Sequence, residues 1–333
     1  MSSVKMAQYG VGHGHAGGKL RSMIQNPNTE VVGVFEPTAD KRAAVQGEEL
    51  YQDIHWFDSE EQMLEDDSIV AIASEGHNHE SLDQTEAIVR AGKHVWYDKP
   101  AGDNWPQWQR VVEDARKQNL HIQMGFMLRY NASFGRVSEW ARSSMLGQIF
   151  SIRAHMSTKL TLEAMQTISV HDGGIHYDLA AHMLDQIVWI LGRPNKVTTF
   201  LREDSGQLPG FPDNTLGVYE FDDAMAFIDI ATLETQPMAR RFEVYGLNGS
   251  AIILEPFEPG GTLRLCLDKD RDGYKRGDQI VEVAATGRQE AYEYELIHFL
   301  DVIAGRERPD RGLDHELLVQ ETLLRGTGKI SGG

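Results

Sequence analysis

Short apolar runs alternate with helix-like stretches through the first 125 or so residues of this chain. The strand-like runs are Val4–Gly10, Val31–Glu36, Ile69–Ala73, His94–Asp98 and His121–Phe126. The helix-like stretches include Ser81–Ala91, which Gly92 closes, and Trp105–Gln118, for which Asn104 is the expected N-cap. This rhythm predicts a parallel sheet covered by helices on both faces.

The pattern changes after about Phe126, where a helix-rich block is followed by strands without intervening helices. These strands are Ile149–His155, Val197–Arg202, Thr215–Phe221, Met225–Leu233, Arg241–Tyr245 and Ala251–Leu254. Consecutive strands of this kind predict a mainly antiparallel sheet. We therefore expect an α/β protein with one domain over residues 1–125 and an α+β domain over residues 126–333, the latter including two final helices.

Composition excludes several classes of protein. A chain of 333 residues is long enough for two domains, and it contains no apolar run near the roughly 20 residues of a membrane helix. The formal charge of −18 argues against nucleic acid or an anionic membrane as the principal partner. The start of the chain lacks the pattern of a secretory signal, and the only cysteine, Cys266, cannot form an intrachain disulfide. We expect a cytoplasmic protein.

A glycine-rich loop follows the first strand, where Met6–Ala16 reads MAQYGVGHGHA. Gly10 and Gly12, with a helix directly after them, are typical of a loop that places a pyrophosphate at a helix N-terminus. The sixth position of that fingerprint is His15 instead of Gly or Ala, and Gly14 lies one place earlier. His13 and His15 are candidates to contact the cofactor or the substrate, and a capping or solvent-exposed role is the alternative for each.

Glu36 ends the second strand, where an acidic side chain can accept hydrogen bonds from the ribose hydroxyls of a dinucleotide. A 2′-phosphate would meet a like charge there, so NAD is favoured over NADP. Lys41 and Arg42 could still accommodate a phosphate, and a solvated strand end is the alternative for Glu36.

Lys99 stands at the carboxyl end of a strand in the run GKHVWYDKP, which covers residues 92–100. Ligands bind at this edge of an open α/β sheet, and Pro100 restricts the backbone of the residue before it. Lys99 is therefore a candidate to act on a ligand, the alternative being a solvated lysine at the start of a loop.

A second constellation lies in residues 169–194, which read SVHDGGIHYDLAAHMLDQIVWILGRP. After Gly173 and Gly174, apolar residues recur at helical spacing from Ile175 to Ile190. Asp178, His182 and Asp185 fall together on another face of that helix. A carboxylate four residues before an imidazole can orient a general acid or base, although such a pair also occurs as a helix-surface hydrogen bond.

These motifs, taken in order, resemble the glucose-fructose oxidoreductase and inositol dehydrogenase (Gfo/Idh/MocA) family. They are the Gly10-x-Gly12 loop, the triplet Asp98-Lys99-Pro100, the segment Arg129-Tyr130 and the helix with Asp178, His182 and Asp185. The resemblance covers nearly the whole chain. The family usually has Glu where this chain has Asp98, which leaves the role of that acid less defined.

The resemblance implies an N-terminal Rossmann domain and a C-terminal domain with an open-faced sheet that forms a homodimer or homotetramer. It also implies hydride transfer between NAD and a sugar or polyol. By that resemblance His182 would be the acid or base, Asp178 its partner, and Lys99 a group that bridges the nicotinamide ribose and the substrate. Further expected cofactor contacts are Ser74, Glu75, His79 and Asp98, with helix capping as the alternative for His79.

Polar residues near the expected junction of the domains are candidates to bind substrate hydroxyl groups. They are Arg129, His155, His171, Asp172, His176 and Tyr177, each of which could instead pair with another protein group. We expect no metal: Asp268-x-Asp270-x-Asp272-Gly273 lacks the final Glu of a calcium loop, and the cluster around His171 and His182 lacks a recognised ligand spacing.

Three functions fit these residues. The first is an NAD-dependent dehydrogenase acting on CH–OH groups of a sugar, polyol or glycoside. The second uses transient oxidation with recycled NAD to eliminate a glycosidic substituent. The third is a non-catalytic NAD-binding regulator, which would have no need of Lys99, Asp178 and His182 together.

Overall fold

A computed structural model describes residues 3–331 of the chain. The chain divides into two compact units, each with its own sheet. The first unit contains the residues up to Phe126 together with Tyr292–Leu317, and the second contains Met127–Ala291 and the residues from Leu318 onward.

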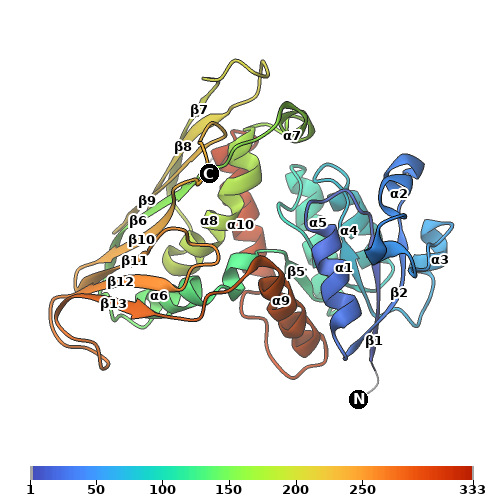
Figure 1. The fold of residues 1–333 in the computed structure, drawn as a ribbon, viewed down its shortest axis with the longest axis horizontal. Coiled ribbons are helices and arrows are strands. Elements are labelled where there is room, and N and C mark those ends of the chain that lie inside the picture. Colours follow the sequence, from blue (N-terminus) through green and yellow to red (C-terminus); the bar gives the residue numbers. More distant parts are fainter. Residues whose placement is uncertain (1–2, 332–333) are drawn as a thin grey trace. The chain divides into compact units, whose positions relative to one another are not determined.

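The first unit is built on a five-stranded parallel sheet (Figure 1). Its strands are β1 (Val4–Tyr9), β2 (Thr29–Phe35), β3 (Ala71–Ser74), β4 (His94–Tyr97) and β5 (Ile122–Met124). The strand order is β2-β1-β3-β4-β5 and every neighbouring pair is parallel. The predicted parallel sheet is therefore confirmed. The order reverses between β1 and β3, so the carboxyl ends of these two strands mark the switch point where such sheets bind ligands.

Helices connect these strands because each connection returns the chain to the same end of the sheet. They are α1 (Ala16–Gln25), α2 (Ala39–Val45), the 3-10 helix η1 (Glu49–Tyr51), α3 (Glu60–Leu64), α4 (Ser81–Arg90) and α5 (Trp105–Lys117). Asn104 caps α5 as expected, since its side chain accepts a hydrogen bond from the Gln107 amide. Leu20 and Met23 of α1 pack into the core against Met6 and Trp96.

The helix α9 (Arg288–Ile303) belongs mainly to the first unit, whereas the sequence pattern predicted it as part of the second domain. Its residues Leu296, Phe299 and Leu300 are part of the core of the parallel sheet. The Phe299 ring stacks on Trp96 with 6.5 Å between ring centroids. The chain thus returns to its first unit before α10 (Leu313–Gly326), a return that leaves no local mark in the sequence.

The second unit is built on an eight-stranded sheet in the order β13-β12-β11-β10-β6-β9-β8-β7. Its strands are β6 (Ile149–Met156), β7 (Lys196–Arg202), β8 (Asn214–Glu220), β9 (Met225–Ala231), β10 (Arg240–Gly246), β11 (Gly249–Ile253), β12 (Thr262–Leu267) and β13 (Gly277–Glu282). All neighbours are antiparallel except β6 and β9, which are parallel. This confirms the predicted mainly antiparallel sheet.

Helices cover one face of the eight-stranded sheet, and Figure 1 shows none on the other. The helices and one 3-10 turn of this unit are η2 (Met127–Tyr130), α6 (Ala132–Arg142), α7 (Leu162–Ile168), α8 (Ile175–Leu191) and the part of α10 from Leu318 onward. The α8 helix packs on β6, β8 and β9, and α6 packs on β10 and β11. Burial alternates along β9, whose Ala226, Ile228 and Ile230 are buried while Met225 is exposed.

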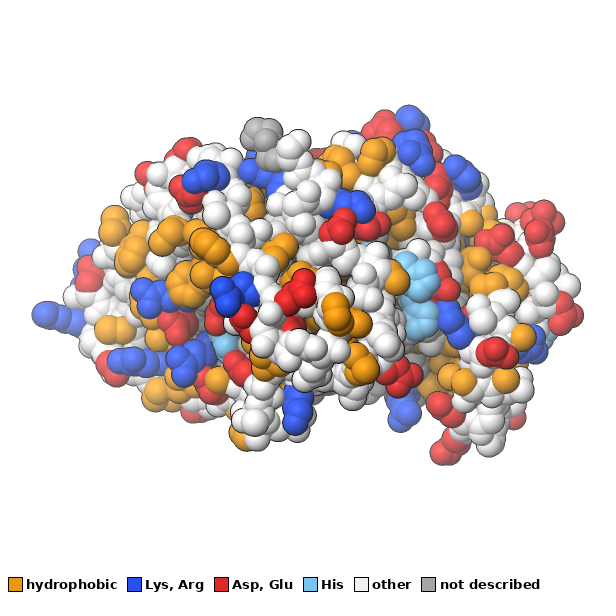
Figure 2. All heavy atoms as spheres, turned by 90° about the horizontal axis from the view of Figure 1, so that it is seen from above, with side chains coloured by type: hydrophobic (Ala, Val, Ile, Leu, Met, Phe, Trp, Pro, Cys, Tyr) orange, Lys and Arg blue, Asp and Glu red, His pale blue; other side chains and the backbone are white. Residues whose placement is uncertain are grey.

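No helix in the described part of the chain is long and apolar enough to cross a membrane. Figure 2 shows one face of the molecule, on which basic side chains are interspersed with acidic ones and do not form a basic patch.

Candidate active site

The glycine loop lies against the loop that follows β3. A Cβ atom at Gly10, where φ is +85°, would lie 2.6 Å from the Gly76 nitrogen, so only glycine fits there. A Cβ at Gly12 would lie 2.9 Å from the His77 ring, and the His13 amide donates a hydrogen bond to the Glu75 carbonyl. A Cβ at Gly14, by contrast, would meet no atom of the protein within 4 Å. The α1 helix begins directly after this loop, which leaves its N-terminus available to a phosphate.

Glu36 directly follows β2 and is held beside the glycine loop. Its Oε2 accepts a hydrogen bond from the Val11 amide and its Oε1 accepts one from the Thr38 amide, both at 2.9 Å. Because each carboxylate oxygen has two lone pairs, both can still accept a ribose hydroxyl. Glu36 also lines a surface pocket of about 490 Å³ with Asp58, Glu60 and Glu61. Arg42 also lines this pocket, so four acids face one cation, and the excess of negative charge opposes a 2′-phosphate.

A buried cluster of charged and polar groups surrounds Asp98 at the end of β4. The Nδ1 atoms of His13 and His15 lie 3.2 and 3.0 Å from its Oδ2, and the Lys19 ammonium lies 3.2 Å from the same oxygen. Oδ1 accepts a 2.7 Å hydrogen bond from the backbone amide of Lys99. The cluster therefore joins the glycine loop, α1 and the Lys99 backbone.

Burial and charge set the protonation states in this cluster. Burial alone would raise the pKa of Asp98, but His13, His15 and Lys19 hold that pKa well below its usual value. Burial lowers the pKa of His15 to about 4 despite the opposing effect of Asp98. His15 is therefore neutral at pH 7 and can donate its Nδ1 hydrogen to an ionised Asp98.

Lys19 is fully buried and lies with its ammonium 4.5 Å from the centre of the Trp96 ring. Burial would lower its pKa, but the carboxylates of Asp98 and Glu75 more than offset this and raise the pKa above its usual value. Burial raises the pKa of Glu75, which lies 3.1 Å from the same ammonium. Lys19 is not among the residues predicted from the sequence, although it falls at helical spacing with the buried Ala16 and Met23.

His13, His15 and Asp98 offer three metal-ligand atoms within 4.8 Å of one another. The Lys19 ammonium, however, already balances the charge of this carboxylate. A divalent cation would add a second positive centre beside it, so the cluster does not favour a metal. The expected absence of a metal stays a prediction.

Lys99 itself is buried at the carboxyl end of β4, with only 3% of its surface exposed. The alternative of a solvated lysine therefore does not hold. The bond between Lys99 and Pro100 is a cis peptide.

The other predicted cofactor residues of the first unit have different surroundings. Ser74 is buried, and its hydroxyl donates to the Ser81 carbonyl and accepts from Thr85. The His79 side chain is 45% exposed and stacks on His77 with 5.7 Å between ring centroids. Ser74 thus serves the internal packing of α4, whereas His79 lies at the surface of the loop after β3.

In the second unit, a tight turn at Gly173 and Gly174 leads into α8. Both have positive φ, and a Cβ at Gly174 would lie 2.4 Å from the Pro212 carbonyl oxygen. On α8, His182 is buried and Asp178 is half-buried one turn earlier on the same side of the helix. The structure thus places the predicted acid or base on a helix with a rigid start.

Arg129 and Asp185 form a buried pair. The Arg129 Nε and Nη2 atoms donate to Asp185 Oδ1 at 3.0 and 2.7 Å. The side-chain amide of Gln186 donates to Oδ2 of the same carboxylate. Arg129 was predicted to bind substrate hydroxyls. In the structure its guanidinium is committed to α8, which it anchors to η2.

The other candidate substrate residues are dispersed. His176 is buried between Tyr219 and Thr215, at 3.0 and 3.3 Å, and burial lowers its pKa to about 4. Asp172 is exposed and pairs with Lys329 at 3.2 Å. His176 therefore belongs to the core of the second unit, and Asp172 belongs to its surface. His171 and Tyr177 stay together, since their rings stack with 4.3 Å between centroids.

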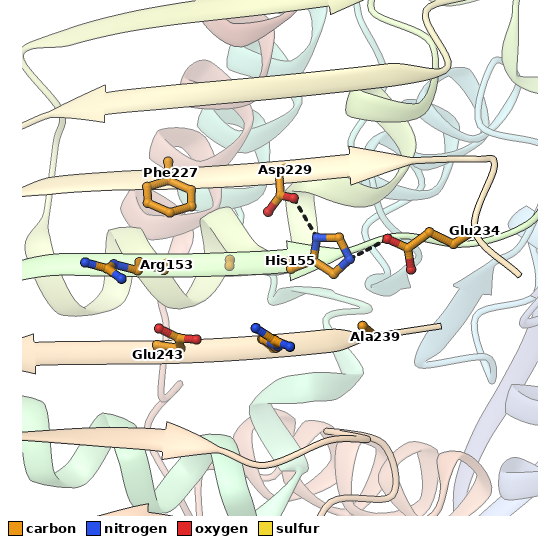
Figure 3. A pocket seen from close by; sticks show the side chains of 9 residues that line it. Arg153, His155, Phe227, Asp229, Glu234, Ala239 and Glu243 are labelled. Atoms are coloured by element: carbon orange, nitrogen blue, oxygen red, sulfur yellow. Dashed lines mark hydrogen bonds and ion pairs between the residues drawn. The ribbon is translucent and has the colours of Figure 1, made fainter. Parts of the chain in front are cut away.

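His155 lies on the face of the sheet opposite to α8. It alternates along β6 with the buried Ala154 and Met156, so its side chain lies in the same row as Arg153. Figure 3 shows its ring between Asp229 and Glu234, each 2.6 Å from one ring nitrogen. The hydrogen bond that Asp229 accepts from His155 Nδ1 raises the pKa of His155. The structure therefore does not bring His155 to the helix that carries His182.

Two family profiles match this chain. The profile of the oxidoreductase family with an NAD-binding Rossmann fold matches residues 7–126, and the GFO/IDH/MocA C-terminal domain matches residues 134–252. The loop and strand end formed by Gly10, Gly12 and Glu36 fit NAD.

The relatives that match this chain in sequence are distant. An uncharacterized oxidoreductase of Escherichia coli, YhhX, is 24% identical over 208 residues, which are 61% of this chain and 58% of that protein. Myo-inositol 2-dehydrogenase of Thermotoga maritima is 24% identical over 270 residues, 79% of this chain and 76% of that protein. The structure of levoglucosan dehydrogenase with NADH and levoglucosan has a TM-score of 0.82 at 14% identity and covers 98% of both chains, which shows a shared fold.

Proposed function

This chain belongs to the GFO/IDH/MocA family of oxidoreductases and has an NAD-binding Rossmann domain, and we propose that it is a dehydrogenase of sugar, polyol or glycoside CH–OH groups. The observation that carries this proposal is the place of Lys99. Lys99 is buried at the carboxyl end of β4, and its backbone amide donates a hydrogen bond to the Asp98 carboxylate. His15 of the glycine loop contacts the same carboxylate. NAD, when bound, accepts the hydride from the substrate carbon.

The roles of the residues follow from the charge changes of the reaction. Oxidation of an alcohol releases a proton from the hydroxyl oxygen as hydride leaves the carbon. His182 accepts that proton, Asp178 orients the imidazole, and Lys99 stabilises the negative charge that develops on the oxygen. Arg129 acts on this helix through Asp185 and so takes no direct part.

NAD is the preferred cofactor because of the acids around Glu36. The carboxylate is fixed by the Val11 and Thr38 amides, so it presents its remaining lone pairs in one direction. The pocket beside it holds four acids and one cation, Arg42, and this excess of negative charge penalises the additional phosphate of NADP.

We further propose that copies of this chain associate through the uncovered face of the eight-stranded sheet. Phe200 and Ile280 are exposed on it, paired in register with Leu216 and Arg264, which lie in the outward-facing rows of β8 and β12. Exposed apolar side chains on an uncovered sheet are typical of a face that another protein surface covers.

The first experiment is NADH absorbance after purified protein and excess NAD are mixed with inositols, aldoses, anhydrosugars and glycosides. We expect turnover with at least one substrate class, and a loss of at least about 100-fold in kcat for Lys99→Ala, because the oxyanion loses its cation. NAD binding, followed by protein fluorescence, should persist in that variant.

The other outcomes separate the alternative functions. Glycoside cleavage without net NADH would favour the mechanism with recycled NAD. Equal turnover by the wild-type protein and Lys99→Ala would contradict the proposed role of Lys99. Binding of NAD with no product from any substrate would support a regulator.

A further inference from the structure

The two positions at which this sequence departs from the expected motifs contact each other. His15 occupies the place where the dinucleotide fingerprint has Gly or Ala, and Asp98 replaces the expected Glu. They are 83 residues apart in the chain, yet His15 Nδ1 lies 3.0 Å from Oδ2 and 3.2 Å from Oδ1 of Asp98. The imidazole thus fills space beside an acid that is one methylene shorter.

The Asp98 carboxylate is buried, so both of its oxygens need partners. Oδ1 accepts the Lys99 amide and Oδ2 faces the Lys19 ammonium. His13 Nδ1 also lies 3.2 Å from Oδ2, but His15 Nδ1 lies within 3.2 Å of both oxygens, so it restrains the rotation of the carboxylate about its Cβ–Cγ bond. That rotation decides whether Oδ1 stays aligned with the Lys99 amide.

Packing around the carboxylate is tight on another side. A Cβ at Gly125 would lie 2.8 Å from the Lys19 nitrogen and 2.9 Å from Asp98 Oδ1. The His15 ring in turn packs against Tyr292, with 5.3 Å between ring centroids. Lys19 and the Gly125 backbone therefore confine the carboxylate, and removal of the imidazole would open space next to it.

We propose that His15 is a positioning residue for Lys99, acting through Asp98. It holds the carboxylate where Oδ1 accepts the Lys99 amide, and so fixes the direction in which the Lys99 side chain leaves β4. This inference rests on the proposed function for its catalytic consequence, but its structural part concerns contacts within the first unit alone. Because His15 is neutral at pH 7, it acts as a hydrogen-bond donor and adds no charge beside Lys99.

Hydrogen exchange of the Lys99 amide tests the structural part directly. A peptide that contains Lys99 and Pro100 reports this amide with little overlap, because proline has none. We expect His15→Ala to speed exchange at Lys99 by about 10-fold, since its acceptor is no longer held. The matched control is His94→Ala, which also removes a histidine hydrogen bond, to the His121 amide, but at the opposite end of β4.

Kinetics test the catalytic part. We expect His15→Ala to lower kcat by about 100-fold with less than a 3-fold change in KM for NAD, because a misplaced Lys99 affects the transition state. His94→Ala should leave kcat unchanged even if it lowers stability. The pair His15→Gly and Asp98→Glu should be non-additive: the double variant should retain more activity than the product of the two single effects predicts.

The outcomes of these experiments can be separated. Unchanged exchange at Lys99 in His15→Ala would overturn the inference even if the protein is an active dehydrogenase. An equal effect of His94→Ala, or a loss confined to KM for NAD, would also overturn it. If the wild-type protein oxidises no substrate, the proposed function fails, while the exchange measurement still decides the role of His15.

Discussion

Glu36 combines a structural and a recognition role in one side chain. Its two oxygens hold the amides of Val11 and Thr38, which ties the glycine loop to the segment after β2. The carboxylate is therefore held in place before any cofactor arrives, and its ordering costs little when a ribose binds. A fixed negative charge at this place discriminates between cofactors through electrostatics as well as through hydrogen bonds.

Replacing this charge should relax the cofactor preference. We expect Glu36→Gln to lower the ratio of kcat/KM for NAD to that for NADP by about 10-fold, because the amide keeps one acceptor but removes the repulsion of a 2′-phosphate. Steady-state kinetics with both cofactors measure the ratio. The matched control, Glu61→Gln, removes a charge from the same pocket without a bond to the glycine loop. An equal effect of the two variants would show that the pocket's overall charge, and not a ribose contact, sets the preference.

The α8 helix depends on the geometry of its first turn. Gly174 is its N-cap, with φ at +52°, and the Ile175 amide donates to the Pro212 carbonyl. The start of the helix is thereby joined to the loop before β8. Arg129 fixes the middle of the same helix through Asp185, so the side chain of His182 projects from a helix held at two points.

Gly174→Ala should disturb this element. Alanine resists positive φ, and its Cβ would lie 2.4 Å from the Pro212 oxygen, so the turn must move. We expect a loss of at least about 1 kcal/mol in the free energy of unfolding, measured with denaturant, and a larger relative loss in kcat than in NAD affinity. Gly192→Ala is the control, since that glycine also has positive φ but its Cβ would meet no atom within 4 Å. A kcat equal to that of this control would contradict the role of the turn.

In the molecule as a whole, one face of the eight-stranded sheet is not covered by helices (Figure 1). The outward-facing row of β6, β9 and β10 carries polar and charged groups such as His155, Asp229 and Arg241, which line a pocket of about 460 Å³ (Figure 3). Apolar residues such as Phe200 and Ile280 flank these strands on either side. A second copy would cover both kinds of surface.

The oligomeric state should respond to this face. We expect light scattering after size exclusion to give a mass at least twice that of one chain, and Phe200→Glu with Ile280→Glu to shift it toward the monomer, because two charges would have to be desolvated. Val170→Glu is the control, since Val170 is equally exposed but lies between α7 and α8. A monomeric wild-type protein would contradict the proposed association.

The sequence by itself determined the class of the fold and indicated the main elements of the candidate site. Alternation of strands and helices, the glycine loop and the strand end at Lys99 are local patterns, because periodicity and turn chemistry act over a few residues. The spacing of Asp178 and His182 on one helix is local in the same way. The assignment to a family rests on the order of these patterns along the chain.

Only the tertiary structure decided which distant groups meet. The contact of His15 with Asp98, the burial of Lys19 beneath it and the pairing of Arg129 with Asp185 join residues from separate segments. The face on which His155 lies depends on the register of β6 with its neighbours, and the return of α9 to the first core depends on a complementary surface there. Such choices minimise buried, unpaired polar groups over the whole fold, a condition that no local pattern contains.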